Sequence, residues 1–468
     1  MTLVVNARRT IPSPIQLAQS NKGQLARILG LGFGIAVIFG GTVGVGILRL
    51  PGEIAGKLGS VKLILLVWVV GGVYSMLGAI SLSEAGAALP QAGGFYVYSK
   101  RAFGPAAGFA VGWADWMINC SSIAYAVVAA SEYLQALTSG ILGQSALIQT
   151  VVALGLLALF CGLHWFGLRL GSGVQKITSV ATGLTFVALA LACLWHGRTA
   201  GHGIAAVGAR PHGAGLLGIL VPLIAVLPAI VVAYDGWYEA IYFTEEDRNA
   251  ARNLPRAMIG GVVLITGLYL LMNLSFLHVL SIPELANSKL AAADAARIVF
   301  PAWSGNFVTV LSLLTLLSLT NALLLGAPRI LFAVGRDGLF PNAANVAAGG
   351  TPRTALLVTA GMVAVIVLSG RFDDIVAVAA ILMAVTYCVN YVAVIVLRMR
   401  EPEMARPFRA WGYPWTTGLV LLGSAAFLIV DVRQDPITAI RAAILLGVAG
   451  PVYWWMRRGN TIRDSKRQ

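Results

Sequence analysis

The sequence predicts an all-α membrane protein that crosses the bilayer with twelve transmembrane helices. Of its 468 residues, 58% are hydrophobic and only 11% are charged, and the mean hydropathy is +0.82. A soluble domain carries about 25% charged residues, so this chain has too few charges to cover a water-soluble core. Its apolar residues gather in blocks of roughly 20, the length at which a helix crosses about 30 Å of hydrocarbon. Because backbone groups in lipid must bond within the protein, repeated blocks of this length predict a helix bundle.

Each apolar block is predicted to form one transmembrane helix. In chain order the blocks are Ile28–Leu48, Lys62–Leu89, Pro105–Leu137, Leu147–Trp165, Val174–Trp195, Leu216–Phe243, Ala257–Leu280, Phe307–Val334, Ala355–Leu368, Ile375–Leu397, Thr416–Val432 and Ile437–Trp455. The longer blocks are expected to tilt or to extend beyond the bilayer. The loop Ser281–Asn306 alternates alanine, leucine and charge over Leu290–Val299, which predicts a short helix at the membrane surface.

The distribution of lysine and arginine predicts the orientation. With the N-terminus inside, 23 of the 33 lysines and arginines fall on the inner side, as the positive-inside rule requires. Both termini are therefore expected in the cytoplasm, in a multi-pass protein of the cell membrane. The net charge of +14 comes from these loops, so it gives no support to nucleic-acid binding. The polar stretch up to Gln24 lacks the basic-then-apolar layout of a cleaved signal peptide.

No separate soluble domain is expected. Residues 1–27 are expected to form a cytoplasmic N-terminal tail, and residues 28–400 a core of ten helices. Residues 401–456 hold helices 11 and 12 with the loop that precedes them, and residues 457–468 form a cytoplasmic C-terminal tail.

Two of the predicted helices are interrupted. Helix 1 has glycines at 40, 41, 44 and 46, followed by Pro51-Gly52, and each glycine in a helix loses backbone entropy relative to alanine. Helix 6 has Pro222 and Pro228, followed by Ala233–Trp237, in which an acid, a glycine and two aromatics break the apolar run.

The two interruptions predict a binding site. Interrupted segments at matching positions of two halves point to a transporter's site, and helices 1 and 6 lie five apart, so helices 1–5 and 6–10 form candidate inverted repeats. A half-helix N-terminus offers donors to a carboxylate, and freed carbonyls accept from an ammonium. A zwitterion fits such a pair. The competing interpretation is that the glycines only allow helices to pack closely.

Ionisable residues at membrane depth are functional candidates. Asp235 lies at the helix 6 interruption, where it would serve the site or hold the break open by pairing with freed N–H groups. Asp115 lies ten residues into helix 3, where it is a candidate proton site unless the helix starts later and leaves it in water. Arg49 would line the outer vestibule, or pair with Glu53 and snorkel to the interface. On the cytoplasmic side, Glu245, Glu246, Arg252 and Arg256 suggest an inner gate or a network that orders the loop.

A series of motifs resembles one known superfamily. In chain order they are Gly44–Leu48, Glu84, Pro90, Gly93–Tyr98, Phe103–Pro105, Gly112-Trp113, Ala233–Trp237, Glu245-Glu246, Arg252–Ala257, Asn321, Arg329–Phe332, Arg336–Gly338, Arg406–Arg409 and Gly412–Pro414. Together they resemble the amino acid–polyamine–organocation superfamily. Within it they are most like bacterial amino acid permeases related to the light subunits of heteromeric amino acid transporters.

The resemblance implies a leucine-transporter-type fold with five-plus-five inverted repeats and alternating access. It implies that the substrate carboxylate lies on Gly44, Val45 and Gly46 and that the ammonium meets carbonyls near Ala233 and Tyr234. The remaining residues expected around the substrate are Thr42, Val43, Val232, Asp235 and Trp237.

The sequence departs from the family pattern in three places. The segment Thr138–Ser145 lacks the cysteine that joins light subunits to a heavy chain, so no disulfide-linked partner is expected. Val232 stands where the family often has an aromatic gate, which leaves occlusion to Tyr234 or Trp237 or leaves room for a bulkier substrate. Thr182 stands where many relatives have a lysine in helix 5. The coupling ion therefore stays open between sodium on Ser318 or Thr320, a proton, and none in an exchanger.

The function predicted is secondary transport of amino acids by alternating access, with neutral amino acids carried by proton coupling or exchange. The alternatives are a cationic amino acid or polyamine transporter, and a non-cycling nutrient sensor. No nucleotide-binding loop, metal cluster or reactive pair occurs in the sequence, so no cofactor, metal or enzyme activity is expected. The substrate and the lipid bilayer are the expected partners, and the oligomeric state is left open.

Overall fold

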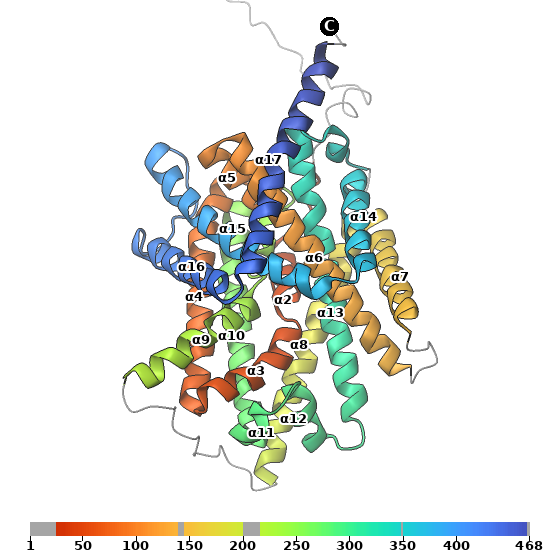
Figure 1. The fold of residues 1–468 in the computed structure, drawn as a ribbon, viewed down its shortest axis with the longest axis vertical. Coiled ribbons are helices and arrows are strands. Elements are labelled where there is room, and N and C mark those ends of the chain that lie inside the picture. The colour runs from red at the N-terminus through yellow and green to blue at the C-terminus, as the bar shows by residue number, and fades with distance from the viewer. Residues whose placement is uncertain (1–24, 139–144, 200–215, 348–349, 466–468) are drawn as a thin grey trace, which may run out of the picture.

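The computed structural model describes residues 25–138, 145–199, 216–347 and 350–465. Across these residues the chain is a helix bundle (Figure 1), and the only extended pairing is an isolated bridge between Leu29 and Asp247. Most of the two predicted tails lies outside the described residues. So do residues 139–144, on which the expectation of no disulfide-linked partner rests.

In the first half of the bundle the described residues form nine α-helices and one 3-10 helix. They are α2 (Leu31–Thr42), α3 (Val45–Leu58), α4 (Val61–Ala88), α5 (Phe95–Phe103), α6 (Pro105–Leu137), α7 (Ala146–Trp165), α8 (Leu168–Thr199), α9 (Leu216–Tyr234), η1 (Glu239–Phe243) and α10 (Ala250–Val279). The second half follows with α11 (Ile282–Ala286), α12 (Ala291–Val299), α13 (Ser304–Arg336), η2 (Pro341–Ala344), α14 (Arg353–Ser369), α15 (Phe372–Arg400), α16 (Trp415–Gln434) and α17 (Pro436–Ser465).

The lengths and hydropathies of these helices confirm a multi-pass membrane protein. Among the described residues, nine helices are long and apolar enough to cross a bilayer, or ten if the bent pair α2 and α3 forms one span. A helix also covers each of the two remaining predicted blocks. Helix α14, with 17 residues, is shorter than the nine, and α6, with 33 residues, is less apolar than they are.

Two features differ from the prediction or add to it, and a third confirms it. The first predicted block ends at Leu48, whereas α3 continues to Leu58 and contains Pro51 within the helix. Helix α5 was not predicted, because its polar residues hide it from a hydropathy pattern. The short helix expected at Leu290–Val299 is present as α12, which buries Ala291, Ala292, Ala295 and Ala296.

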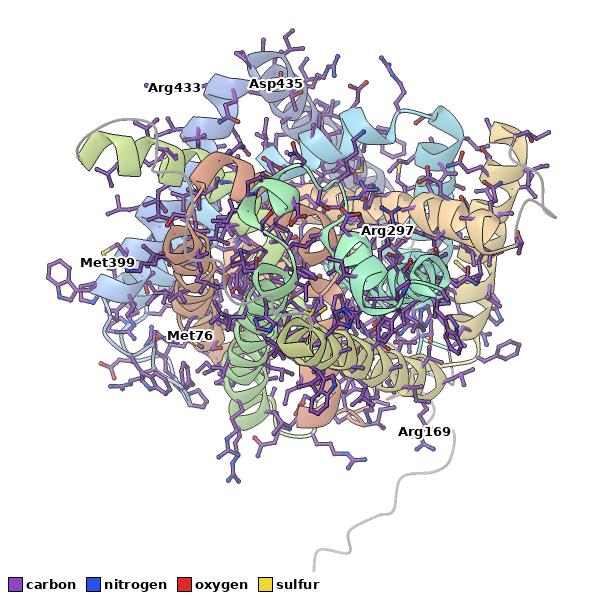
Figure 2. The ribbon with its side chains drawn as sticks, turned by 90° about the horizontal axis from the view of Figure 1, so that it is seen from below. Met76, Arg169, Arg297, Met399, Arg433 and Asp435 are labelled. Atoms are coloured by element: carbon purple, nitrogen blue, oxygen red, sulfur yellow. The ribbon has the colours of Figure 1, made fainter. Side chains whose placement is uncertain are left out.

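The bundle has two distinguishable ends. Helices α11 and α12 lie at one end, at the bottom of Figure 1, and α5 lies at the other; we call these the α12 end and the α5 end. Helices α6 and α13 pack along each other, and α2 packs on α8, α10 and α13. Helix α16 packs on α15 and α4 and exposes Trp415, Leu419 and Leu422, a face that suits lipid. Figure 2 shows Arg169, Met399 and Arg433 at the rim of the bundle.

A buried carboxylate ties the segment before α16 to the core. Glu84 of α4 accepts hydrogen bonds from Arg398 of α15 and from the Ala410 backbone N–H, the latter at 2.7 Å. Arg406 also lies 3.1 Å from the same carboxylate. A buried charge needs such partners, so this cluster fixes the loop of residues 401–414 against helices α4 and α15.

Candidate functional site

The first interruption separates α2 from α3, whose axes differ by 49°. Val43 has extended backbone angles, and its N–H donates the last helical bond to the Phe39 carbonyl at 2.8 Å. Two glycines before the break allow close approach. A Cβ on Gly40 would overlap the side chains of Gln175 and Ser318, and one on Gly41 would lie 2.7 Å from Cγ of Glu239.

The second interruption separates α9 from η1 and lies against the first. Gly236 has a φ of +99°, a left-handed conformation that strains other residues. A Cβ there would also lie 2.5 Å from the Gly41 carbonyl oxygen. The two breaks therefore touch through backbone atoms, and the glycines at 41 and 236 are what permits the contact.

A tyrosine of α10 connects the carbonyls of both breaks. The Tyr269 hydroxyl lies 2.8 Å from the Ala233 carbonyl and 3.2 Å from the Thr42 carbonyl, and it donates to these oxygens. Its ring is buried against Trp68 and Tyr234 at centroid distances of 5.2 and 5.0 Å. The sequence motifs did not point to Tyr269, because its partners lie 36 and 227 residues away.

A cavity of about 350 Å³ opens beside the two breaks. This volume falls in the range typical of small-molecule sites. It is lined by residues of the breaks and of α6, α13 and α15, namely Gly41, Thr42, Gly44, Gly46, Arg49, Leu50, Ile118, Asn119, Ser122, Tyr125, Val232, Ala233, Asp235, Gly236, Tyr238, Glu239, Leu316, Leu319, Leu323 and Val376.

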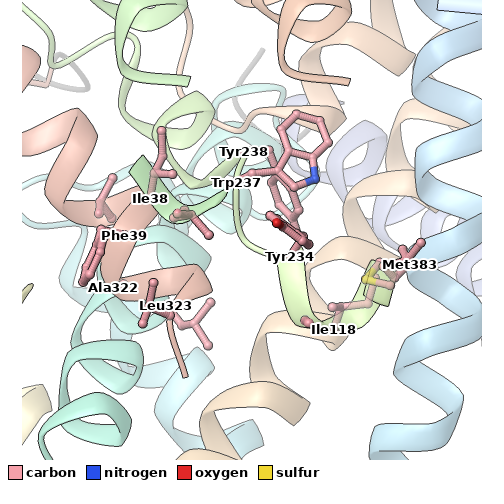
Figure 3. Close-up of a cluster of buried hydrophobic side chains, with 14 of the residues drawn as sticks. Ile38, Phe39, Ile118, Tyr234, Trp237, Tyr238, Ala322, Leu323 and Met383 are labelled. Carbon is pink, nitrogen blue, oxygen red and sulfur yellow. The ribbon is translucent and has the colours of Figure 1, made fainter. Parts of the chain in front are cut away.

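Several residues expected around the substrate line this cavity, and others do not. Thr42, Gly44, Gly46, Val232, Ala233 and Asp235 are among the lining residues. Val43 is fully buried away from it, and the side chain of Val45 lies outside the described residues. The Tyr234 hydroxyl instead donates to the Trp68 carbonyl at 2.8 Å, and Trp237 packs on Tyr238 and Tyr387. Figure 3 shows Tyr234, Trp237 and Tyr238 in this aromatic cluster.

Two acidic side chains, Asp235 and Glu239, line the cavity, and a third, Asp115, is buried nearby. Asp235 accepts a hydrogen bond from the Tyr387 hydroxyl of α15. Asp115 of α6 is 1% exposed, so it does not lie in water, and one of its oxygens accepts from Tyr242 at 2.7 Å. Glu239 is also 1% exposed and lines the cavity. The sequence interpretation missed Glu239, although an acid inside the sixth apolar block was a sufficient signal.

The comparisons with known proteins identify the family. A family model described as amino acid permease matches residues 34–440. The chain belongs to the amino acid permease family. This confirms the resemblance to the amino acid–polyamine–organocation superfamily.

Curated relatives of the permease cover nearly its whole length. The serine/threonine exchanger SteT of Bacillus subtilis (strain 168) is 26% identical over 93% of this chain and 98% of its own. The human b(0,+)-type amino acid transporter 1 is 28% identical over 96% of this chain and 91% of its own length. The mouse Asc-type amino acid transporter 1 is 29% identical over 93% of this chain and 82% of its own length. These relatives are named as exchangers or transporters of amino acids, so the permease is an amino acid transporter rather than an enzyme.

A polar cluster joins α2, α8 and α13 on the α2 side of the first break. The Gln175 Nε2 atom lies 3.2 Å from the Ala36 carbonyl, 3.1 Å from Ser179 Oγ and 3.2 Å from Ser318 Oγ. Its Oε1 atom accepts from Asn321 at 2.7 Å. Of the predicted coupling residues, Ser318 belongs to this cluster. Thr320 donates to its own helix at Leu316, and the buried Thr182 hydroxyl has no partner among the described residues.

Ion pairs gather at the α5 end of the permease. Arg329 of α13 pairs with Glu246, and both side chains are buried, with Nη2–Oε1 at 2.8 Å. Arg336 pairs with Glu245 at 2.8 Å, and Lys100 pairs with Asp337. The predicted network thus uses both glutamates, while Arg252 and Arg256 are exposed and form no ion pair among the described residues.

At the α12 end the cavity mouth carries Arg49. This arginine is exposed and lines the cavity, while Glu53 pairs with Lys57 at 2.7 Å rather than with Arg49. The cavity therefore reaches from the breaks toward the α12 end, past Leu316 and Tyr125, and the ion pairs separate it from the α5 end.

Proposed function

We propose that the permease binds the main chain of its amino acid between the two breaks and carries it by alternating access. The observation that supports this most is the N-terminus of α3 beside the cavity. Gly44 is its N-cap and no side chain caps it, so the first N–H groups of α3 are available to a carboxylate. Both Gly44 and Gly46 line the cavity, and neither has a side chain that would cover these N–H groups.

The substrate ammonium would lie at the opposite, carbonyl-rich side of the breaks. The carbonyls at the ends of α2 and α9 point away from their own helices, and the partial negative charge of a helix C-terminus favours a cation. The Tyr269 hydroxyl would hold these two helix ends at a fixed separation. Carboxylate and ammonium of one amino acid would then bridge α3 and the two helix ends.

The substrate side chain would extend toward α6 and α13. The walls there are mainly apolar, with Ile118, Leu319 and Leu323 facing the cavity. This favours neutral amino acids of moderate size, moved by proton coupling or exchange. The two carboxylates of Asp235 and Glu239 favour the second candidate, a cationic amino acid, because each could pair with a charged side chain.

The orientation and repeat architecture are part of the proposal. We infer twelve transmembrane helices in the cell membrane, with helices 1–5 and 6–10 as inverted repeats and both termini in the cytoplasm. The α5 end carries Lys100, Arg101, Arg329 and Arg336, so the positive-inside rule places it on the cytoplasmic side. The cavity then opens outward and the ion pairs form a closed inner gate. The permease is expected to work without a disulfide-linked heavy chain, a cofactor or a metal.

The test is transport by the purified protein in liposomes. Vesicles loaded with one unlabelled amino acid are given the same labelled amino acid outside, and counterflow is measured for alanine, serine, leucine, lysine and arginine. Counterflow of the neutral amino acids supports the proposal, and preference for lysine and arginine supports the second candidate. The Asp235→Asn variant further distinguishes the neutral from the cationic candidate. If Asp235 orders the break through Tyr387, transport of every substrate falls. Loss of arginine transport alone would assign Asp235 to the substrate side chain.

A further inference from the structure

Glu239 is a buried carboxylate without a partner. It is 1% exposed and lies at the start of η1 on the wall of the cavity. Among the described residues no hydrogen bond or ion pair reaches it, and its enclosed Oε2 atom is unsatisfied. By contrast, Asp235 and Asp115 each accept from a tyrosine hydroxyl. A buried ionised group without a partner is costly, so such a carboxylate takes up a positive charge.

The groups around Glu239 supply no positive charge. Helix α2 has no ionisable side chain. Helix α13 has Arg329 and Arg336, but these pair with Glu246 and Glu245. The ionisable residues of helix α10 are Arg252, Arg256, Tyr269 and His278. The two arginines are exposed at the α5 end, and the Tyr269 hydroxyl donates to the Ala233 carbonyl. The nearest charged or titratable groups are Asp115 on α6, Asp235 in the preceding turn, and the phenols of Tyr238 and Tyr242.

We propose that Glu239 carries the proton that drives transport. The inference rests on the proposed function, in which an amino acid binds in the same cavity. With the cavity open to the outside, an aqueous proton bonds to the carboxylate as the amino acid enters. After the inner gate opens, the O–H bond breaks and the proton leaves to the other side. No oxidation or further reactant is involved.

A proton fits this site better than a substrate ammonium does. Oε2 is enclosed between the helices, where a Cβ on Gly326 of α13 would lie 3.3 Å from it. Because Oε2 has almost no accessible surface, a substrate ammonium would have to displace neighbouring atoms to reach it, whereas a proton needs no such space. Glu239 also lies near two other acids, Asp115 and Asp235, whose negative charges disfavour its ionised form. Protonation removes this repulsion, because it removes the charge of Glu239 itself.

The position of Glu239 links its charge to the motion of helix 1. Its Cγ atom packs on Gly41, directly before the first break, and its carboxylate reaches α13. Protonated, the side chain can stay enclosed while α2, η1 and α13 pack together. Ionised, it favours an arrangement that admits water. Protonation thereby favours the closed packing that must precede opening at the other end.

The experiment measures proton flux and amino acid flux in the same liposomes. Vesicles with a trapped pH-sensitive dye receive the amino acid that counterflows best, and uptake of the labelled substrate is recorded in parallel. Wild type is expected to acidify the lumen and to accumulate substrate under an inward proton gradient. In Glu239→Gln the ratio of proton flux to amino acid flux should fall at least tenfold. The control Glu132→Gln, whose side chain bonds to Gln149 at the end of α6, should keep the wild-type ratio.

Each other outcome overturns the inference. An unchanged flux ratio in Glu239→Gln does so, as does selective loss of lysine and arginine uptake with proton flux intact. In wild-type vesicles without internal amino acid, net uptake that moves no protons, or no net uptake under an inward proton gradient, overturns the inference, and counterflow in the same preparation then leaves the proposed function standing. Absence of counterflow in wild type defeats the proposed function itself. If Glu239→Gln does not fold, Glu239→Asp serves instead: it should keep proton flux with a shifted pH profile, and an unshifted profile counts against the role.

Discussion

The Tyr269 hydroxyl donates a 2.8 Å hydrogen bond to the Ala233 carbonyl at the end of α9, and the Thr42 carbonyl at the end of α2 lies 3.2 Å from the same oxygen. One side chain of α10 thus connects two helix ends that no local sequence relationship brings together. The helix ends that would receive the substrate ammonium are held in register by this contact.

Tyr269→Phe should therefore weaken substrate binding while the protein still folds. A hydrogen bond of this kind contributes about 0.5–1.5 kcal/mol, so the half-saturating concentration should rise up to roughly tenfold. The matched control is Tyr74→Phe, which removes a 2.7 Å hydroxyl contact with Ser424 of α16 and touches neither of the two carbonyls. Counterflow is titrated with substrate for both variants. Equal half-saturating concentrations in the two would show that Tyr269 does not support substrate binding.

Gly46→Val should abolish transport. A Cβ at Gly46 would lie 3.5 Å from Ala233 Cα, an ordinary contact, so the fold tolerates it while the branched side chain fills the space that the substrate carboxylate needs. Gly267→Val on α10 is the control, because nothing lies within 4 Å of a Cβ there. Uptake and thermal stability are measured for both. Normal substrate affinity in Gly46→Val would move the carboxylate site elsewhere.

Replacing sodium by choline should leave wild-type uptake unchanged. The Gln175 amide nitrogen lies within 3.1–3.2 Å of three oxygens between α2, α8 and α13, so it fills the space that a cation would need there. Gln175→Ala should lower both uptake and melting temperature, whereas Gln149→Ala, which removes only a solvent-exposed hydrogen bond to Glu132, should change neither. Strict dependence of wild-type uptake on sodium would contradict this prediction.

Arg329→Ala should destabilise the permease far more than Arg336→Ala. The first substitution leaves Glu246 buried and unpaired, which costs about 3–5 kcal/mol. The second breaks a partly exposed pair worth about 0–1 kcal/mol. Replacing Arg329 and Glu246 together by methionine should restore much of the stability, since two apolar side chains leave no unpaired charge. Melting temperatures of the detergent-solubilised variants test this, and equal losses in the two arginine variants would rule out the buried pair as the stronger contact.

A cysteine at Lys289 should react with an impermeant thiol reagent added outside, and one at Ala405 should not. Both positions are exposed. Lys289 follows α11 at the α12 end and Ala405 lies between α15 and α16. The test uses a background in which the four native cysteines are replaced. The opposite labelling pattern would reverse the orientation and place the cavity mouth in the cytoplasm.

The sequence alone determined the class of the protein and the place of its two breaks. Membrane-length apolar blocks are a property of consecutive residues, so α4, α7, α8 and most other helices could be located from hydropathy. The breaks could be located for the same reason, because glycines at 40–46 and the Ala233–Trp237 motif disturb the helix locally. The ordered series of motifs likewise identified the family. Helix α5, which is short and polar, gave no such pattern.

Which side chains meet at the breaks was decided only by the tertiary structure. Tyr234 stands in the break motif, yet the rotation of α9 turns its hydroxyl to Trp68, while Tyr269 from α10 reaches the freed carbonyls. Gln175 contacts Ala36 and Ser318 across 139 and 143 residues of sequence. Glu239 lines the cavity without a partner because the packing of α2, η1 and α13 brings no basic group to it. These contacts depend on how each helix is rotated and how closely glycines let it approach its neighbours, and a pattern along one helix does not contain that information.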